Sequence, residues 1–394
     1  MDVIITPKKL SGKIKAISSK SVAHRMFICA SLADGESEIE VDSLSRDIEV
    51  TISALEAMGA EIKRKGSVFY VTPIKDKNDC VVDCCDSGST LRFLVPLGAA
   101  LGKKCVFTGK GRLPQRPMGT LLSVLNENGV KTNSSFPIEI EGQLEKGNFE
   151  IDGGVSSQFI TGLLMALNRI GGGEIKVKGK TESKSYIDIT LSVMKKFGVN
   201  VTEKESSYIV PDENFSAGKF VVEGDWSNAA FFLASGVEVE NLDLDSKQGD
   251  KKFKDILPLL ESDEEEIFID VSDIPDLVPI IAVKASVRKG KTNIINAERL
   301  KLKESDRIVS TVSMINDLGG QAEGDDKSIT VFGKEKLKGG EVSSFNDHRI
   351  AMATAIASQY CEEKVIIRDA EAVEKSYPDF YEHFRQLGGI CDVL

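Results

Sequence analysis

Residues 54–60 read Ala54-Leu55-Glu56-Ala57-Met58-Gly59-Ala60, the end of a helix, a glycine and the start of a strand. The glycine stands where a helix C-terminus needs a left-handed residue. The pattern recurs four more times along the chain, with its glycine at Gly129, Gly198, Gly319 and Gly388. Most neighbouring copies lie about 70 residues apart, and one wider gap has room for a degenerate copy, which we assign to residues 253–260. The chain is therefore built from an internal repeat.

A second class of helix repeats in step with the first. These segments are apolar nearly all round, which is typical of buried helices. Their expected starts lie near Ser21, Ser89, Ser157, Ser227, Asp276 and Asp347. The sequence thus predicts six units, three in each half of the chain, with buried parallel helices at the centre and strands outside. The fold class is α/β (α+β), with two similar domains.

The two domains are expected to be formed by different parts of the chain. The switch between them falls near residues 222–225, and the first strand, Asp2 to Thr6, is expected to return to the C-terminal half. Domain 1 therefore comprises residues 1–18 and 224–394, and domain 2 comprises residues 19–223. Helix N-termini attract anions, so two such domains facing each other would form an anion-binding cleft.

Composition narrows the classes of protein. The 394 residues are 41% hydrophobic and 28% charged, as in an ordinary globular protein, and the length favours two domains. A net charge of −11 argues against non-specific nucleic-acid binding. No apolar run suits a membrane span and no signal peptide is visible, so a cytoplasmic location is expected. The seven cysteines read as reduced thiols, and with three histidines no metal site is expected.

The most charged helix start is Leu302-Lys303-Glu304-Ser305-Asp306-Arg307. Ser305 is the expected N-cap, which places Lys303 and Glu304 ahead of the helix and Arg307 in its first turn. A solvated, charged turn is the ordinary interpretation of such a stretch. Cations and hydroxyls recur in phase at the other helix starts, however, and this recurrence favours a site for anionic ligands.

The other helix starts carry similar side chains. They include Ser18 to Arg25, Asp86 to Arg92, Arg112 to Pro117, Val155 to Gln158, Ser183 to Tyr186, Asp273 to Asp276, Asn346 to Arg349 and Lys375 to Asp379. Serine and aspartate are also common helix caps, so each segment alone has a purely structural explanation. Lys289 to Thr292 imitates the end of a phosphate-binding P-loop, but Ala285 occupies the position of its upstream glycine, which excludes that motif.

Taken in order, these motifs resemble the 5-enolpyruvylshikimate-3-phosphate synthase family from Pro7 to Phe380. The resemblance implies an enolpyruvyl transferase-like inside-out α/β barrel, with three βαβαββ units in each domain and an active site in the interdomain cleft. It implies transfer of the 1-carboxyvinyl group of phosphoenolpyruvate to the 5-hydroxyl of shikimate 3-phosphate, with release of phosphate. That reaction belongs to chorismate and aromatic amino acid biosynthesis. No cofactor, nucleic acid or membrane partner is implied, and a monomer that closes by induced fit is expected.

The resemblance also implies roles for individual residues. The groups expected to bind shikimate 3-phosphate are Ser21, Arg25, Ser156, Ser157, Ser183, Tyr186, Asp276 and Lys303. Those expected to bind phosphoenolpyruvate are Lys20, Asp86, Gly88, Arg116, Gln158, Arg307, Arg349 and Lys375. The expected catalytic residues are Asp276, which accepts the hydroxyl proton with help from Lys20, and Glu304, which protonates C3.

Three positions, Glu304, Asp86 and Arg299, bear on these roles. The neighbouring cations Lys303 and Arg307 should lower the pKa of Glu304, although a general acid must carry a proton at working pH. We expect bound trianionic substrate to offset this effect in the closed complex. Asp86 stands where many family members have Asn and Arg299 where some have Asn, and both differences bear on substrate affinity and on the response to phosphonate inhibitors.

The sequence features argue against three other classes of protein. A sister enolpyruvyltransferase acting on UDP-N-acetylglucosamine would carry a reactive cysteine or aspartate in the loop from Arg112 to Arg116, which has neither. A repeat scaffold or nucleic-acid clamp would not need Glu304 and Asp276 among cations. An RNA-end-processing enzyme of related architecture would need a nucleophilic histidine, and His24, His348 and His383 are not placed convincingly for that role.

Overall fold

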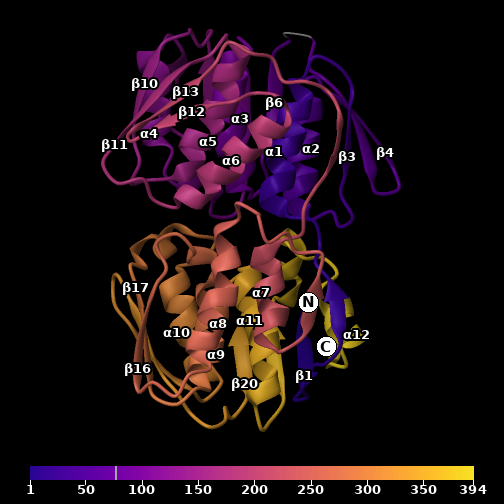
Figure 1. The fold of residues 1–394 in the computed structure, drawn as a ribbon, viewed down its shortest axis with the longest axis vertical. Helices are drawn as coiled ribbons and strands as arrows, with labels where there is room; N and C mark the ends of the chain where they lie inside the picture. Colours follow the sequence, from indigo (N-terminus) through magenta and orange to yellow (C-terminus); the bar gives the residue numbers. More distant parts are fainter. Residues whose placement is uncertain (76–77) are drawn as a thin grey trace. The chain divides into compact units, whose positions relative to one another are not determined.

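The computed structural model describes residues 1–75 and 78–394, which fold into two compact units (Figure 1). Unit 1 comprises Met1–Ile17 and Gly224–Leu394, and unit 2 comprises Ser18–Glu223. Ser18, which the sequence analysis placed in domain 1, lies in unit 2. Its backbone N–H and its hydroxyl both donate to Asp42 Oδ1, at 2.8 and 2.5 Å, and this pair of bonds fixes it there.

Unit 2 contains three sheets of the same design. Each has a parallel pair of strands followed by two antiparallel neighbours. The strand orders are β14(Lys219–Val221)-β3(Ser37–Glu40)-β5(Val68–Thr72)-β4(Glu61–Lys65), then β6(Cys80–Asp83)-β7(Cys105–Thr108)-β9(Ile138–Glu141)-β8(Lys131–Thr132), and β10(Asn148–Asp152)-β11(Gly173–Lys178)-β13(Ser207–Val210)-β12(Thr202–Lys204). A parallel pair needs a crossover, which α3(Gly88–Ala100) supplies between β6 and β7 and α5(Ser157–Arg169) supplies between β10 and β11. Most of unit 2 lies between β3 and β14.

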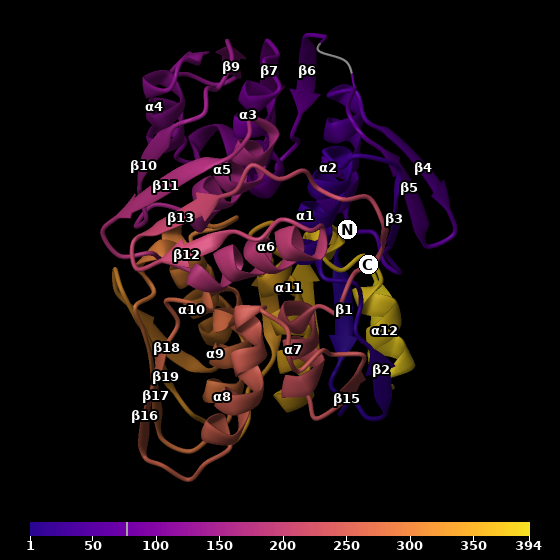
Figure 2. The same ribbon diagram turned by 45° about the horizontal axis from the view of Figure 1, so that its top comes forward.

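The helices of unit 2 fall into two groups. Those buried on nearly every face are α1(Lys20–Ser31), α3(Gly88–Ala100) and α5(Ser157–Arg169). Those with one exposed face are α2(Arg46–Ala57), α4(Gly119–Glu127) and α6(Lys184–Lys196). In Figure 2 the buried helices run inside the unit, and α5 packs against both α3 and α6. This arrangement brings the polar N-terminal ends of the helices into one region of the unit.

Unit 1 repeats the design with one reduced member. Its complete sheets are β16(Glu266–Asp270)-β17(Lys291–Ile295)-β19(Ile329–Phe332)-β18(Gln321–Gly324) and β20(Gly340–Ser343)-β21(Val365–Arg368)-β1(Val3–Thr6)-β22(Ile390–Val393). The third sheet has only β15(Glu238–Glu240) and β2(Lys13–Lys15). The helices are α7(Trp226–Ala234), α8(Phe253–Leu260), α9(Val278–Ser286), α10(Arg307–Asp317), α11(His348–Ala357) and α12(Phe380–Gln386).

The structure confirms the repeat inferred from the sequence. The five repeat glycines all have positive φ, from +80° to +100°. The degenerate copy is α8, which spans the assigned residues 253–260. The first strand, β1, pairs antiparallel with β21 and β22 of the C-terminal half because Val3 and Ile5 pack into that core. Within the described residues, no helix is long and apolar enough to cross a membrane.

One detail of the helix starts was wrong. The N-cap of α10 is Asp306 rather than Ser305, and its carboxylate accepts from the Val309 N–H at 3.3 Å. The Ser305 hydroxyl is engaged elsewhere, because it lies 2.9 Å from Ser310 Oγ and donates to Asp347 Oδ2 at 3.0 Å. A tertiary contact has therefore displaced the cap by one residue.

Candidate active site

In unit 2, Arg25 ties the starts of three helices together. It lies on α1 and is 2% exposed. Its Nε donates to Thr190 Oγ1 at 2.8 Å and its Nη2 to the Tyr186 carbonyl at 3.0 Å, both on α6, while Nη2 also reaches Thr161 of α5 at 3.4 Å. Nη1 donates to the Ser21 carbonyl at 2.6 Å. Burial lowers the pKa of Arg25 to about 10, so the side chain keeps its charge at neutral pH.

The three serines expected to hold a phosphate lie in adjoining loops. Ser156 is the N-cap of α5, Ser157 is its first residue, and Ser183 precedes α6 with a left-handed φ of +52°. The loops touch, because the Glu182 N–H donates to the Gly153 carbonyl at 3.2 Å. They follow the parallel strands β10 and β11, whose carboxyl ends meet at one sheet edge. Hydroxyls and helix N-termini of this kind suit an anion.

A second cluster in unit 2 surrounds the start of α3. Gly88 is its first residue, and a Cβ there would lie 2.4 Å from Arg116 Nη1, so only glycine allows this close approach. Gln158 of α5 donates to Ser89 Oγ at 2.9 Å and accepts from Arg92 Nη1 at 2.7 Å. Asp86 lies in the turn just before the helix. The cluster joins α3, α5 and the loop that carries Arg116.

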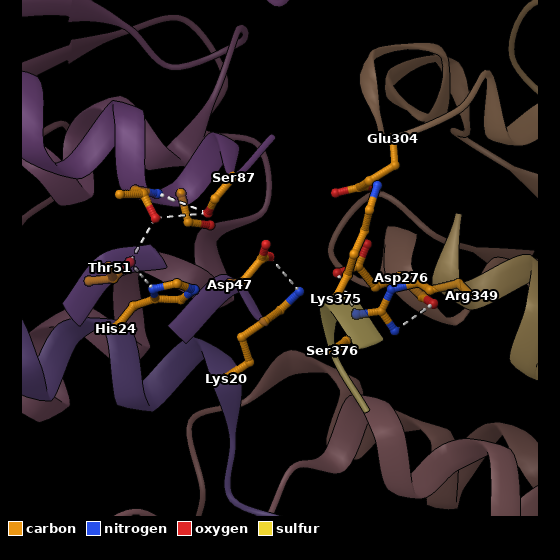
Figure 3. A network of polar contacts seen from close by, with 12 residues as sticks. Lys20, His24, Asp47, Thr51, Ser87, Asp276, Glu304, Arg349, Lys375 and Ser376 are labelled. Carbon is orange, nitrogen blue, oxygen red and sulfur yellow. Dashed lines mark hydrogen bonds and ion pairs between the residues drawn. The ribbon is translucent and has the colours of Figure 1, made fainter. Parts of the chain in front are cut away.

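Lys20 opens α1 and makes an ion pair that the sequence analysis missed. Its Nζ donates to Asp47 Oδ2 of α2 at 3.1 Å, and the two side chains are only 15% and 16% exposed (Figure 3). Asp47 follows Ser45, an ordinary helix-cap residue. Asp47 lies one helical turn before the buried Thr51, so the two side chains share a face of α2. That spacing is the one feature of the sequence that could have indicated a buried role for Asp47.

In unit 1, one carboxylate collects three cations. Asp276 lies in the short helix η3(Pro275–Leu277) ahead of α9. Its Oδ1 accepts from Lys303 Nζ at 3.1 Å and from Arg307 Nη1 at 2.7 Å, and its Oδ2 accepts from Arg349 Nη2 at 3.1 Å. These partners come from the start of α10, the segment before it and the start of α11. Burial lowers the pKa of Lys303, although the Asp276 charge opposes this effect.

Arg307 is the most enclosed cation of this group. Its side chain is 0% exposed and contacts three carboxylates, those of Asp276, Glu304 and Asp347. A guanidinium has five N–H donors, and four of them are engaged, with Nε and Nη2 bonding Asp347 at 3.0 and 3.3 Å and Nη2 bonding Glu304 at 2.7 Å. Burial by itself would lower the pKa of Arg307, but the three carboxylates outweigh this effect and raise it.

The remaining residues of unit 1 complete this region. Glu304 lies in the loop between η4(Glu298–Leu302) and α10, and its side chain is 23% exposed. Lys375 ends η6(Ala370–Lys375), and its Nζ donates to the Asn346 carbonyl at 3.1 Å. Figure 3 shows Glu304, Lys375, Asp276 and Arg349 as neighbours within unit 1. The structure thus brings together the unit 1 residues that the sequence analysis assigned to substrates and catalysis.

The comparisons with other proteins identify the family. The sequence profile described as EPSP synthase (3-phosphoshikimate 1-carboxyvinyltransferase) matches residues 4–384. This chain belongs to the EPSP synthase family. Family relatives named 3-phosphoshikimate 1-carboxyvinyltransferase include one from Clostridium kluyveri, 42% identical over 99% of this chain and 98% of the relative, and one from Clostridium perfringens, 41% identical over 98% of each. The solved EPSP synthase of Acinetobacter baumannii covers all of both chains with a TM-score of 0.82 at 22% identity, which establishes the shared fold.

A further acidic side chain near Asp276 was also missed. Asp250, in η2(Gly249–Lys252), is 6% exposed, and its Oδ1 has no hydrogen-bond partner in the described part of the chain. Burial raises the pKa of Asp250 to about 6, and the charge of Asp276 adds to this, while Arg349 opposes it. No local sequence pattern marks Asp250, because its raised pKa depends on burial and on Asp276, which belongs to a different copy of the repeat.

We expect Asp250→Asn to stabilise the free protein above pH 6. The pKa of Asp250 is about 6 in the folded protein and near 3.8 in the unfolded chain, so the folded state binds the proton more tightly. The free energy of unfolding of the wild-type protein therefore falls as the pH rises from about 4 to about 6. The gain should reach at most about 3 kcal/mol and vanish below pH about 4. Urea unfolding at several pH values measures it, with the exposed Asp255→Asn as control. A gain that is independent of pH would contradict this explanation.

Proposed function

We propose that the chain transfers the carboxyvinyl group of phosphoenolpyruvate to the 5-hydroxyl of shikimate 3-phosphate and releases inorganic phosphate. This makes it a transferase of the shikimate pathway, which leads to chorismate and the aromatic amino acids. The observation that carries the proposal is the family match over nearly the whole chain. The grouping of cations and carboxylates around Asp276 supports it.

The acceptor substrate is assigned mainly to unit 2. Ser156, Ser157 and Ser183 bind the phosphate of shikimate 3-phosphate, which is supported by their positions in the two touching loops at the starts of α5 and α6. Ser21, Arg25 and Tyr186 hold the ring and its hydroxyls. Arg25 acts chiefly by fixing Tyr186, because its guanidinium already bonds that backbone. We also assign Lys303 and Asp276 of unit 1 to this ring.

Phosphoenolpyruvate is assigned to residues of both units. Unit 2 supplies Lys20, Gly88, Arg116 and Gln158, with Asp86 beside them, and unit 1 supplies Arg307, Arg349 and Lys375. Cations from two units favour a mechanism in which the units close around the substrates, an induced fit that excludes water. In a water-excluded site, charge-assisted hydrogen bonds to a trianion are strong. Arg307 contacts the ligand through its remaining N–H or by exchanging a carboxylate partner.

The reaction proceeds by addition and elimination. Asp276, assisted by Lys20, accepts the proton of the 5-hydroxyl as its oxygen bonds to C2 of phosphoenolpyruvate, and Glu304 gives a proton to C3. The tetrahedral adduct then loses a proton from C3 and its phosphate, which restores the double bond. Three cations fix the position of the Asp276 carboxylate, which is 16% exposed. We further propose a monomer located in the cytoplasm.

One assay tests the proposed function. Mixing the protein with shikimate 3-phosphate and phosphoenolpyruvate should release phosphate, and omission of either substrate should abolish the release. Replacing shikimate 3-phosphate with UDP-N-acetylglucosamine, the acceptor of the sister enzyme, should give none. Absence of phosphate release by folded protein with both substrates would refute the proposal.

A further inference from the structure

A buried line of hydrogen bonds crosses three helices of unit 2 (Figure 3). His24 Nδ1 of α1 lies 2.7 Å from Thr51 Oγ1 of α2, which lies 2.7 Å from Thr90 Oγ1 of α3. Thr90 Oγ1 donates to Ser87 Oγ at 2.8 Å, and Ser87 is the N-cap of α3. All four side chains are at most 1% exposed. We call this line the His24 chain.

The direction of the protons along the His24 chain follows from its last bond. Because Thr90 donates to Ser87, the Thr90 oxygen accepts from Thr51. Thr51 has then used its only proton, so its oxygen accepts from an N–H at His24 Nδ1. Nε2 of His24 carries no proton in this tautomer, and within the described residues it has no hydrogen-bond partner.

The surroundings of His24 keep its imidazole neutral. Burial lowers the pKa of His24 well below its ordinary value, and the charges of Lys20 and Arg25 on the same helix lower it further. The carboxylate on the neighbouring helix, Asp47, is paired with Lys20. From α3, Phe93 meets the imidazole edge-on, with ring centroids 6.3 Å apart. A single tautomer is therefore held without a charge.

The His24 chain lies directly behind the helix starts assigned to phosphoenolpyruvate. Lys20 and His24 are one turn apart on α1, as are Asp47 and Thr51 on α2, so two rungs join these helices. The outer rung is the ion pair of Lys20 and the inner rung is the bond of His24. The far end of the chain caps α3 immediately before Gly88, where a Cβ would lie 2.4 Å from Arg116 Nη1.

We propose that the His24 chain positions Lys20 and the first turn of α3 for phosphoenolpyruvate, an inference that rests on the proposed function. None of its four members is assigned to a substrate, so they act as positioning residues. The phosphate of shikimate 3-phosphate is assigned to loops ahead of α5 and α6, which the His24 chain does not reach. Its ring is assigned in part to Arg25 of α1, but that side chain is fixed by Thr190 and Tyr186 of α6 rather than by the His24 chain. Breaking the chain should therefore affect one substrate and spare the other.

Steady-state kinetics of Thr51→Val test this split. Valine has nearly the same shape but no hydroxyl, so it interrupts the chain at its centre. We expect KM for phosphoenolpyruvate to rise about tenfold, which corresponds to one lost buried hydrogen bond, with KM for shikimate 3-phosphate changed less than about twofold. Thr51→Ser restores a hydroxyl and should restore the wild-type KM. A Thr51→Val variant with both KM values unchanged, or with both raised equally, would overturn the proposal.

A matched control and a second readout separate positioning from loss of stability. Thr292 of β17 is equally buried and, among the residues described, its hydroxyl has no partner, so Thr292→Val should leave both KM values unchanged. Nitrogen-15 NMR of the wild-type protein should show His24 as the neutral Nδ1–H tautomer between pH 6 and 8. An Nε2–H tautomer or a charged ring would also overturn the proposal. This measurement needs no turnover, so it remains decisive if the proposed reaction itself fails.

Discussion

Replacing Glu304 with glutamine is expected to lower turnover by about 10²–10⁴-fold, the usual contribution of a general acid, while both substrates still bind. Glutamine keeps the length of the side chain and an oxygen that can accept from Arg307, as Glu304 Oε2 does at 2.7 Å. It has no proton to give to C3. Single-turnover phosphate release measures the chemical step, and calorimetric titration measures binding of shikimate 3-phosphate and of phosphoenolpyruvate.

The matched control for this variant is Glu298→Gln. Glu298 is an exposed carboxylate in η4, a few residues earlier in the same segment, and its replacement should change neither turnover nor binding. Near-normal turnover by Glu304→Gln would remove Glu304 from the mechanism. Loss of binding together with turnover would instead assign it a role in holding substrate. Arg307 engages the Glu304 carboxylate in the free protein, so we expect Glu304 to act as a donor only when substrate engages that guanidinium.

Replacing Arg307 with methionine is expected to destabilise unit 1 by about 3–5 kcal/mol, the cost of leaving a buried charge without its partner. Both members of the pair formed by Arg307 and Asp347 are 0% exposed, and Arg307 also neutralises Asp276 and Glu304. Methionine fills much of the same volume but gives no hydrogen bond and no charge. Urea unfolding, followed by a probe in unit 1 such as Trp226, measures the loss.

Two comparisons sharpen this experiment. Adding Asp347→Asn to Arg307→Met removes one of the uncompensated charges and should recover part of the stability. Arg368→Met removes an arginine that also bonds two carboxylates, Asp2 and Glu341, but Arg368 is 41% exposed and its charge is screened by solvent, so this loss should be much smaller than that of Arg307→Met. Equal effects of the two arginine replacements would contradict the importance we assign to burial.

Local sequence patterns were sufficient to predict the architecture. The helix-ending glycines and the apolar character of the buried helices both report interactions between near neighbours in sequence. These interactions repeat wherever the residues repeat, which is why even the reduced copy, α8, could be assigned from its length and position. The motif resemblance then extended this reading to candidate site residues, and the structure gathers those of unit 1 around Asp276.

Local sequence patterns did not predict the contacts of side chains that bond residues from a distant part of the chain. Serine is a common N-cap residue, but the Ser305 hydroxyl bonds Asp347 and Ser310 instead. Asp306 is therefore the N-cap of α10. Asp47 and Asp250 look like ordinary surface residues in the sequence. Packing turns the first into the partner of Lys20 and buries the second near Asp276.

The sequence by itself determined the repeat, the class of fold and the residue types gathered at the helix starts. The tertiary structure alone decided which of these residues meet, as when Arg307 bonds Asp276 and Asp347, 31 and 40 residues away. Backbone preferences and apolar periodicity act over a few residues and can be read from the chain. The partners of a buried charge are set by the packing of helices from different repeats, and their strength by the exclusion of water, which no local pattern records.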